Sequence, residues 1–519
     1  MPVPLTYPGV YIEEVPSGVR TITGVATSIA AFLGRTLRGT PNEPAVINSF
    51  ADFERQFGGL WVESPMTYAV RDFYRNGGTQ AVIVRVFRSG GATDDTASVA
   101  LRSPGADFTV RASSPGTWGN RLRARVDYDI GDPTSRTLFN LTIRDDTTGQ
   151  IETFRNLSIE ADHPRRADKV INESSLVRAS TAPDPINRPT EHTDPTATDP
   201  LWDDNGTNSV FEDTDGDDGV ELIGAHYTEG TESNKTGLYA LEKVDLFNLL
   251  CIPPHGQNDI EQGLIDTAAA YCERRRAILI VDPPAEWNGK DDAAAGVGSV
   301  GTSSSHAALY FPRLRTPNPL RDNQLEDFAP CGAVAGIIGR TDAQRGVWKA
   351  PAGLEATIVG APALSVPLTD AENGKLNPLG INCLRAMPAA GRVVWGARTL
   401  EGADRRASEW KYLPVRRTAL FIEESLYRGT QWVVFEPNAE PLWAQIRLNV
   451  GAFMNRLFRQ GAFAGTTPRE AYFVKCDSQT TTQTDVDLGV VNIVVGFAPL
   501  KPAEFVVIQL QQMAGQIAT

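Results

Sequence analysis

The chain has 519 residues, which corresponds to roughly three or four domains of ordinary size. Its 49 Lys and Arg residues against 63 Asp and Glu residues give a formal net charge of −14, which argues against a generic nucleic-acid binder with a basic surface. A hydrophobic content of 41% and a charged content of 22% are ordinary for a globular protein, so global disorder and a collagen-like fibre are not expected.

Residues 1–20 do not look like the start of a domain. Pro2, Pro4, Pro8 and Pro16 exclude a helix, and residues 10–15 alternate loosely as a strand does. Such a short strand must join a sheet, either an edge of this chain's own sheet or the sheet of a neighbouring chain. The segment has no basic start and no apolar core, so we expect no secretory signal, and we expect no membrane insertion because no stretch approaches about 18 apolar residues.

The next part of the chain alternates between helices and strands. Residues 49–57 and 64–75 carry apolar side chains at helical spacing, each behind a serine that can cap the helix. A run at 80–86 follows that is apolar except for Gln80 and Arg85, and it predicts a buried strand.

A second group of elements predicts a β-α-β unit. Residues 244–252 and 277–281 read as strands, and the residues between them have the periodicity of a helix. We expect this helix to be capped by Asn258, because Glu261 three residues later completes a capping box. A strand, a helix and a strand in this order predict a partly parallel sheet.

An insertion separates these two groups. Residues 105–178 alternate as β-strands, and residues 179–219 are poor in apolar side chains. Residues 203–221 contain eight acidic residues and no Lys or Arg: Asp203, Asp204, Glu212, Asp213, Asp215, Asp217, Asp218 and Glu221. We therefore expect an exposed, mobile acidic loop on a β-rich inserted domain.

The acidic loop resembles a calcium-binding loop only in part. Asp213, Asp215 and Asp217 occupy the first, third and fifth positions of an EF-hand pattern. Asp218 stands where the pattern needs a glycine, and Gly224 stands where it needs a glutamate. A solvated loop is therefore favoured over a calcium site.

Other signals of chemistry are weak. Gly296, Gly298 and Gly301 match a dinucleotide-binding pattern, but no strand precedes them, so a flexible loop is favoured. The cysteines and histidines show no metal-binding spacing, and we expect reduced thiols: Cys251, Cys272, Cys331, Cys383, Cys476, His163, His192, His226, His255 and His306. We expect that the protein binds no cofactor and no metal and is not an enzyme.

Two acidic residues stay as candidates for an alternative, enzymatic function. Asp245 and Asp282 lie in or at the ends of the strands of the β-α-β unit, where active sites of α/β sheets occur. Nothing near them in the sequence pairs with them, so a capping or turn role is favoured.

The C-terminal part mixes helices and strands. Residues 419–427 read as a helix, residues 431–435 as a short strand, and Asn438 as the cap of a long helix. The apolar stripe of that helix predicts core packing: Trp443, Ile446, Val450, Phe453 and Leu457. Three arginines lie off the stripe and form a local basic face that is either solvated or docked to an acidic partner: Arg447, Arg456 and Arg459.

The chain ends in two further strand-like runs. Residues 487–497 and 503–510 are separated by the break at Pro499 and Pro502. A strand near each terminus, each behind prolines, has the composition of arms that neighbouring subunits exchange.

Several segments, taken in order, resemble contractile tail sheath proteins. The matching segments lie at 7–14, 114–120, 345–351, 376–381, 419–425, 431–437, 441–445, 468–476 and 496–504. The resemblance covers nearly the whole chain, with the acidic insertion as the main exception. The family comprises the sheaths of contractile phages, R-type pyocins and extracellular contractile injection systems.

The resemblance implies a mixed α/β and α+β multidomain fold. It implies an N-terminal arm at 1–20, a mixed-sheet core domain at 21–104 and 236–394, and an outer β-rich domain at 105–235 with an acidic loop at 179–221. It also implies a C-terminal α+β domain near an inner tube at 395–500 and a C-terminal arm at 501–519.

The resemblance also implies how subunits join. The arm strands would add to the C-terminal domain of neighbouring subunits: Val10, Tyr11, Ile12, Val15, Phe505, Val506, Val507 and Ile508. The accepting sheet would contain Tyr472, Val474, Val491, Ile493 and Val495. Arg447, Arg456 and Arg459 would be candidate contacts to the tube.

A sheath function implies stacked hexameric rings that contract and drive the inner tube forward. The partners would be other copies of this chain, the tube protein, and baseplate and terminator proteins, within a particle assembled in the cytoplasm of the producing cell. The alternatives are a non-contractile assembly protein, such as a decoration or S-layer-like subunit, and an α/β enzyme that uses Asp245 or Asp282.

Overall fold

A central sheet of mixed direction organises the fold. In the computed structural model, residues 20–91, 95–194, 202, 209–211, 216–255 and 259–509 are described. Within them, the central sheet has the order β18-β17-β13-β12-β11-β1-β3-β2. Its strands are β1 (Ala30–Gly34), β2 (Ala45–Ile47), β3 (Ala81–Arg85), β11 (Leu249–Cys251), β12 (Ile278–Val281), β13 (Ala307–Phe311), β17 (Ile381–Met387) and β18 (Gly391–Val394). Neighbours are parallel from β17 through β3, and the two edge strands are antiparallel.

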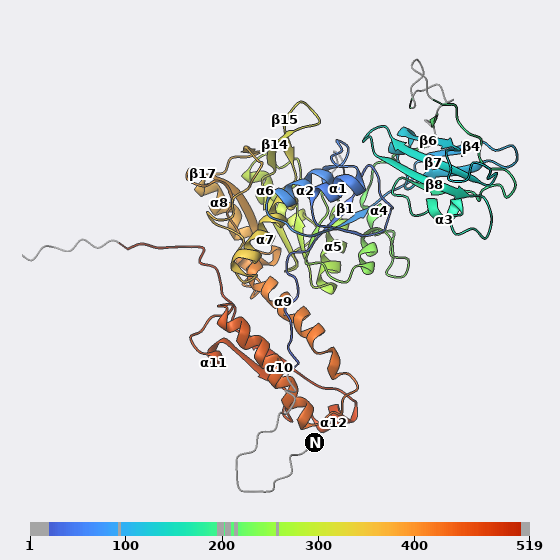
Figure 1. Cartoon of the computed structure of the whole chain (residues 1–519). Coiled ribbons are helices and arrows are strands. Elements are labelled where there is room, and N and C mark those ends of the chain that lie inside the picture. Colours follow the sequence, from blue (N-terminus) through green and yellow to red (C-terminus); the bar gives the residue numbers. More distant parts are fainter. Residues whose placement is uncertain are drawn as a thin grey trace, which may run out of the picture.

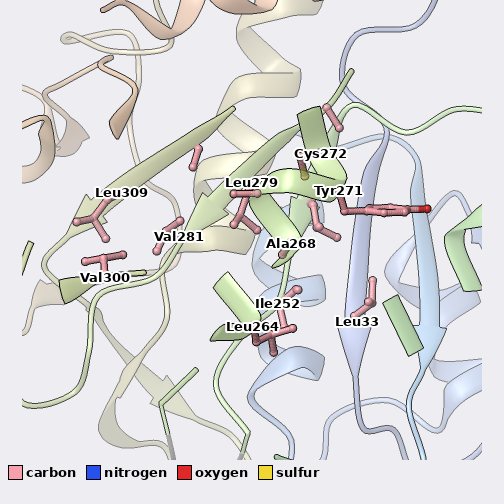
Figure 2. Packing of buried hydrophobic residues seen from close by; sticks show 14 of the residues in the cluster. Leu33, Ile252, Leu264, Ala268, Tyr271, Cys272, Leu279, Val281, Val300 and Leu309 are labelled. Atoms are coloured by element: carbon pink, nitrogen blue, oxygen red, sulfur yellow. The ribbon is translucent and has the colours of Figure 1, made fainter. Parts of the chain in front are cut away.

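Both faces of this sheet are covered, which explains the continuous apolar strands. On one face, α5 (Gln262–Arg274) packs Leu264 and Ala268 against Leu33 and Leu279 (Figure 2). On the other face lie α1 (Phe50–Phe57), α2 (Pro65–Arg75) and α7 (Cys331–Arg345). Helices α2 and α7 pack closely, since a Cβ at Gly332 would come within 1.9 Å of the backbone oxygen of Ala69.

The predicted β-α-β unit is present, with two corrections to its details. β11 and β12 are parallel and flank α5 in the sequence. The strand predicted at 244–252 is only Leu249–Cys251, and residues 244–248 form an irregular connection from the 3-10 helix at Gly237–Lys243. Glu261 takes the N-cap position of α5 instead of Asn258, which lies outside the described residues.

The inserted part contains two small antiparallel sheets around a core of its own. One has the order β10-β6-β7-β8 and the other β4-β5-β9, and α3 (Ala167–Ile171) packs beside them. The strands are β4 (Ser98–Leu101), β5 (Phe108–Ala112), β6 (Leu122–Asp127), β7 (Leu138–Asp145), β8 (Ile151–Ser158), β9 (Val177–Ala179) and β10 (Val210–Phe211). The first strand of the insertion, β4, begins at Ser98, before the predicted boundary at residue 105. At the other end, Tyr227 of α4 (Gly224–Thr228) packs in the core of the central part, before the predicted boundary at residue 235.

The acidic loop is described only in part, and its described end is bound to the protein. The candidate cation ligands Asp213 and Asp215 lie outside the described residues. The carboxylate of Asp218 accepts hydrogen bonds at 2.8 Å from both the backbone N–H and the hydroxyl of Thr117. The loop is therefore attached to the rest of the protein at Asp218.

Smaller elements complete the central part. A three-stranded sheet has the order β15-β14-β16, and two short helices lie near β17. Their bounds are β14 (Leu314–Asn318), β15 (Gln324–Phe328), β16 (Ala363–Leu364), α6 (Lys290–Gly296) and α8 (Asp370–Leu376).

The C-terminal part is built around two long helices. Figure 1 shows α9 (Leu413–Gly429) leading from the central part towards α10 (Glu440–Arg459). Leu413 and Leu420 of α9 pack in the central core, while Ile422 packs with α10, so one helix bridges the two cores. The remaining elements are α11 (Pro468–Ala471), β19 (Tyr472–Lys475), α12 (Gln483–Asp487) and β20 (Val494–Phe497).

Three C-terminal predictions need correction. The strand predicted at 431–435 is a 3-10 helix at Gln431–Val433. Ala439 takes the N-cap position of α10, because the side chain of Asn438 instead accepts a hydrogen bond from the indole of Trp443. The run at 487–497 contains a strand only at Val494–Phe497. In the described part of the chain, no helix combines the length and apolar character that crossing a membrane requires.

Candidate assembly surface

A two-stranded sheet on α10 holds most of the predicted acceptor residues. β19 and β20 are antiparallel, and Tyr472 faces Phe497 while Val474 faces Val495. These side chains pack against the core of the C-terminal part, whereas Phe473 and Val494 on the other face are 49% and 44% exposed. Val491 and Ile493 precede β20 and are partly buried in the same core.

Both edges of this sheet are open within the described residues. β19 and β20 pair only with each other there. The N–H of Ala498 donates to the oxygen of Ala471 at 2.8 Å, one step outside the pair of Tyr472 and Phe497. Because hydrogen-bonded and non-hydrogen-bonded pairs alternate, the backbone groups of Val474 and Val495 point away from each other, towards the open edges. Open edges of this kind accept an added strand.

The C-terminal segment after Glu504 is extended and apolar. Residues 505–509 have no regular secondary structure and leave the rest of the molecule in Figure 1. Phe505, Val506, Val507 and Ile508 are 75%, 82%, 80% and 78% exposed. Four consecutive exposed apolar side chains are unusual on a soluble surface and indicate a segment that becomes covered in an assembly.

Glu504 anchors this segment to the central part. Its carboxylate oxygens lie 2.7 and 2.6 Å from Nε and Nη2 of Arg398, whose side chain is inaccessible to solvent. The hydroxyl of Tyr412 donates to the same carboxylate at 3.2 Å. Burial alone would raise the pKa of Glu504, but the hydrogen bonds and charge of Arg398 lower it below its usual value. Sequence reasoning missed this pair, because no local pattern connects residues 106 positions apart.

The beginning of the described chain lies along the C-terminal helices. The N–H of Arg20 donates to the side chain of Asn449 at 3.1 Å, and the guanidinium of Arg456 donates to the oxygen of Ile22. Arg20 and Ile22 therefore lie beside α10. The predicted N-terminal arm strand lies outside the described residues: Val10, Tyr11, Ile12 and Val15.

The three arginines of the predicted tube contact differ in their surroundings. Arg447 pairs with Glu440 at 2.6 Å and donates to the oxygen of Cys476. Arg456 is held by Ile22, as described above. Arg459 is exposed and makes no hydrogen bond or ion pair with the described residues. Of the three, Arg459 is the one without a hydrogen bond or ion pair to the described residues, while Arg456 makes a hydrogen bond but no ion pair with them.

Asp245 and Asp282, the two candidates for an enzymatic function, have separate structural partners. Asp245 forms an ion pair with Arg428, which lowers its pKa. Burial raises the pKa of Asp282 to about 6, and one of its oxygens accepts the backbone N–H of Cys331 at 2.8 Å at the start of α7. This hydrogen bond gives Asp282 a structural role at a helix N-terminus.

Other candidate sites are also accounted for by structure. His255 lies between the hydroxyl of Tyr227 and the carboxylate of Glu261, at 3.2 and 3.0 Å. The glycine-rich segment at 296–301 follows the helix α6 instead of a strand. Among the residues that the structure describes, no three His, Cys, Asp or Glu side chains form a group that could hold a metal ion.

Comparisons with known families point to one kind of protein. Residues 224–400 match the phage tail sheath protein central domain, and residues 406–513 match the phage tail sheath C-terminal domain. Together the two matches span more than half of the chain. No curated protein sequence matches the chain.

Solved structures share the fold over almost the whole length. A sheath complex of the extracellular contractile injection system PVC, in the contracted state, is 22% identical, with a TM-score of 0.59 over 98% of this chain and 99% of that chain. A chain of the anti-feeding prophage baseplate is 23% identical, with a TM-score of 0.56 over 98% and 100%. A sheath tail protein from Listeria innocua is 14% identical, with a TM-score of 0.61 over 92% and 96%. The proteins matched in family and fold are structural proteins of sheaths and tail-like particles.

Proposed function

Because this chain belongs to the phage tail sheath protein family, we propose that it polymerises as stacked hexameric rings around an inner tube and contracts to drive that tube through a target envelope. The observation that carries this proposal is a complementary pair of features in one chain. The C-terminal part offers a sheet with two open edges, and the segment after Glu504 offers an exposed apolar strand former.

The two features fit each other across subunits. A strand that adds to an open edge gains backbone hydrogen bonds, each of which contributes about 0.5–1.5 kcal/mol net. Four to six such bonds give a few kcal/mol per arm, which is modest for one pair of subunits. Repeated throughout a lattice, the same contact makes a continuous mesh. Residues 10–15 and 505–508 would be the donated strands, and Tyr472, Val474, Val491, Ile493 and Val495 would belong to the accepting region.

Contraction requires two arrangements of the same subunits. An extended lattice that is metastable relative to a contracted one would store the free energy that moves the tube. The arms would stay engaged while the subunits rotate. The similarity of the fold to a sheath in the contracted state supports this proposal over a non-contractile lattice.

The parts of the subunit would have separate positions in the particle. We place the elements from α10 to β20, which belong to the predicted C-terminal domain at 395–500, next to the tube, with Arg459 as the first candidate contact and Arg447 and Arg456 as further candidates. The core at 21–104 and 236–394 would form the body of the sheath, and the insertion at 105–235 would face outward. The ends of the sheath would meet baseplate and terminator proteins, and assembly would take place in the cytoplasm of the producing cell.

The test is to image the purified protein by negative stain with and without its inner tube protein. Long, striated, hollow cylinders are expected when both proteins are present. A monodisperse monomer under all conditions would contradict the proposal. Removal of residues 1–19 should abolish the cylinders and leave the circular dichroism spectrum unchanged, and cylinders formed without these residues would contradict the exchange of the N-terminal arm.

A further inference from the structure

We infer that Arg398 is a positioning residue for the C-terminal arm: by holding Glu504, it fixes the point at which residues 505–519 leave their own subunit. This inference rests on the proposed exchange of that arm between subunits. It assigns to a buried residue of the central part a role in placing a strand that a neighbouring subunit accepts.

The first support is that one residue, Glu504, makes the polar contacts between this segment and the rest of the chain. Among the described residues 500–509, Glu504 alone makes hydrogen bonds or ion pairs with the rest of the chain. Residues 500–505 themselves line a groove of about 710 Å³, together with Trp348, Trp395 and Tyr412. Loss of the Glu504 contact would therefore release the segment from the central part.

The second support is the preorganisation of Arg398. Its Nη1 donates to the backbone oxygens of Asn377 at 2.9 Å and of Gly402 at 3.4 Å, while its further contact to Asp404 is to a half-exposed carboxylate that Lys411 also binds. Its Nε and Nη2 remain for Glu504, which they bind with the two parallel hydrogen bonds that arginine and carboxylate favour. The central part therefore holds the guanidinium group of Arg398 in position before it binds Glu504 of the arm.

A fixed starting point favours the proposed strand exchange. An arm that is not attached at its first residue would sample many directions, and ordering it at the sheet edge of a neighbouring subunit would cost conformational entropy. An arm held at Glu504 begins from one place, so its apolar residues reach the neighbouring sheet at a higher effective concentration.

The experiment compares three full-length chains: the wild type, Glu504→Gln and Asp404→Asn. The Glu504→Gln substitution keeps the size of the side chain but removes its charge, while Arg398 keeps Asp404 as a counterion. Asp404→Asn is the matched control, because it removes a carboxylate from the same guanidinium without changing the arm. The unassembled subunits are treated with chymotrypsin, and release of residues 506–519 after Phe505 is followed by intact mass spectrometry.

We expect cleavage after Phe505 to be at least about tenfold faster in Glu504→Gln, since local release governs proteolysis. Asp404→Asn should stay within about twofold of the wild type, and the thermal midpoint of Glu504→Gln should be unchanged. Equal cleavage of Glu504→Gln and wild type would overturn the inference. Equal acceleration in both variants would also overturn it, because Arg398 would then act on local folding in general.

The same variants separate this inference from the proposed function. Mixed with tube protein, Glu504→Gln should form fewer and shorter cylinders than Asp404→Asn. If cleavage is accelerated but both variants and a chain lacking residues 505–519 form normal cylinders, arm exchange fails while the anchor remains. If cleavage is unchanged and the chain lacking 505–519 does not assemble, the anchor fails while arm exchange remains.

Discussion

Arg417 of α9 and Asp342 of α7 form a two-point ion pair, with distances of 2.9 and 2.5 Å between their nitrogen and oxygen atoms. Both side chains are nearly inaccessible, at 3% and 4% exposed. The hydroxyl of Thr27 donates to the same carboxylate at 2.7 Å, and Arg417 donates to the oxygen of Thr27 at 2.9 Å. One cluster therefore joins three parts of the chain: Thr27 near the beginning of the described residues, helix α7 on the central sheet, and helix α9, which leads to the C-terminal part.

Arg417→Ala should lower the free energy of unfolding by about 3–5 kcal/mol, because it leaves the buried carboxylate of Asp342 without its counterion. Chemical denaturation followed by tryptophan fluorescence measures the change. The matched control is Arg55→Ala, which breaks an exposed pair with Asp52 and should change the free energy of unfolding little. Equal costs for the two variants would show that the Arg417 pair does not hold these elements together.

The sequence predicted the parts of the fold that depend on local periodicity. The helix behind Ser49, the β-α-β unit and the apolar stripe of α10 all appear, because each follows from spacing within about twenty residues. The strand predicted at 431–435 failed, because Trp432 and Val433 pack against the C-terminal core from a 3-10 turn instead of from a sheet. Tertiary packing overrode β propensity there.

Contacts between distant residues could not be predicted in this way. The exposure of residues 505–508 agrees with an exchangeable arm, but the anchor at Glu504 depends on Arg398 in another part of the fold. Likewise, the spacing of the arginines in the sequence predicts the basic face of α10. Only the structure separates Arg447 and Arg456, which have partners within the chain, from Arg459.

The open edge of β19 gives a second prediction. Val474→Pro removes a backbone N–H that points to that edge, so it should block strand addition there without breaking a hydrogen bond within the subunit. We expect cylinders to be lost in mixtures with tube protein, while circular dichroism stays unchanged. Val474→Ala keeps the N–H and should assemble. Normal cylinders from the proline variant would show that no strand adds to the β19 edge.

The third prediction concerns the pH dependence of stability. Burial, together with the charge of Arg416, lowers the pKa of His306 to about 4. The unfolded chain binds a proton at this residue near pH 6.5, whereas the folded chain does not, so the contribution of His306 to stability falls as the pH drops from about 7 towards 4.

Denaturation of the wild type and His306→Gln between pH 7 and pH 5 tests this sign. The free energy of unfolding of the wild type should fall relative to that of the variant by about 1–2 kcal/mol over this range. The comparison cancels the opposite trend from Asp282, whose raised pKa favours the folded state at lower pH. A difference that stays constant with pH would contradict a neutral, buried His306.

The last prediction separates tube contact from subunit stability. Arg459→Gln removes an exposed charge near the end of α10 that has no partner among the described residues, so the thermal midpoint should change little. If Arg459 faces an acidic tube surface, co-sedimentation with preformed tubes should weaken about two- to tenfold per subunit contact, and the loss should shrink at high salt. Arg405→Gln is the matched control, because Arg405 is also exposed but precedes α9 and lines a groove with Gln262 of α5. Equal binding of both variants to tubes would place the tube on another face of the C-terminal part.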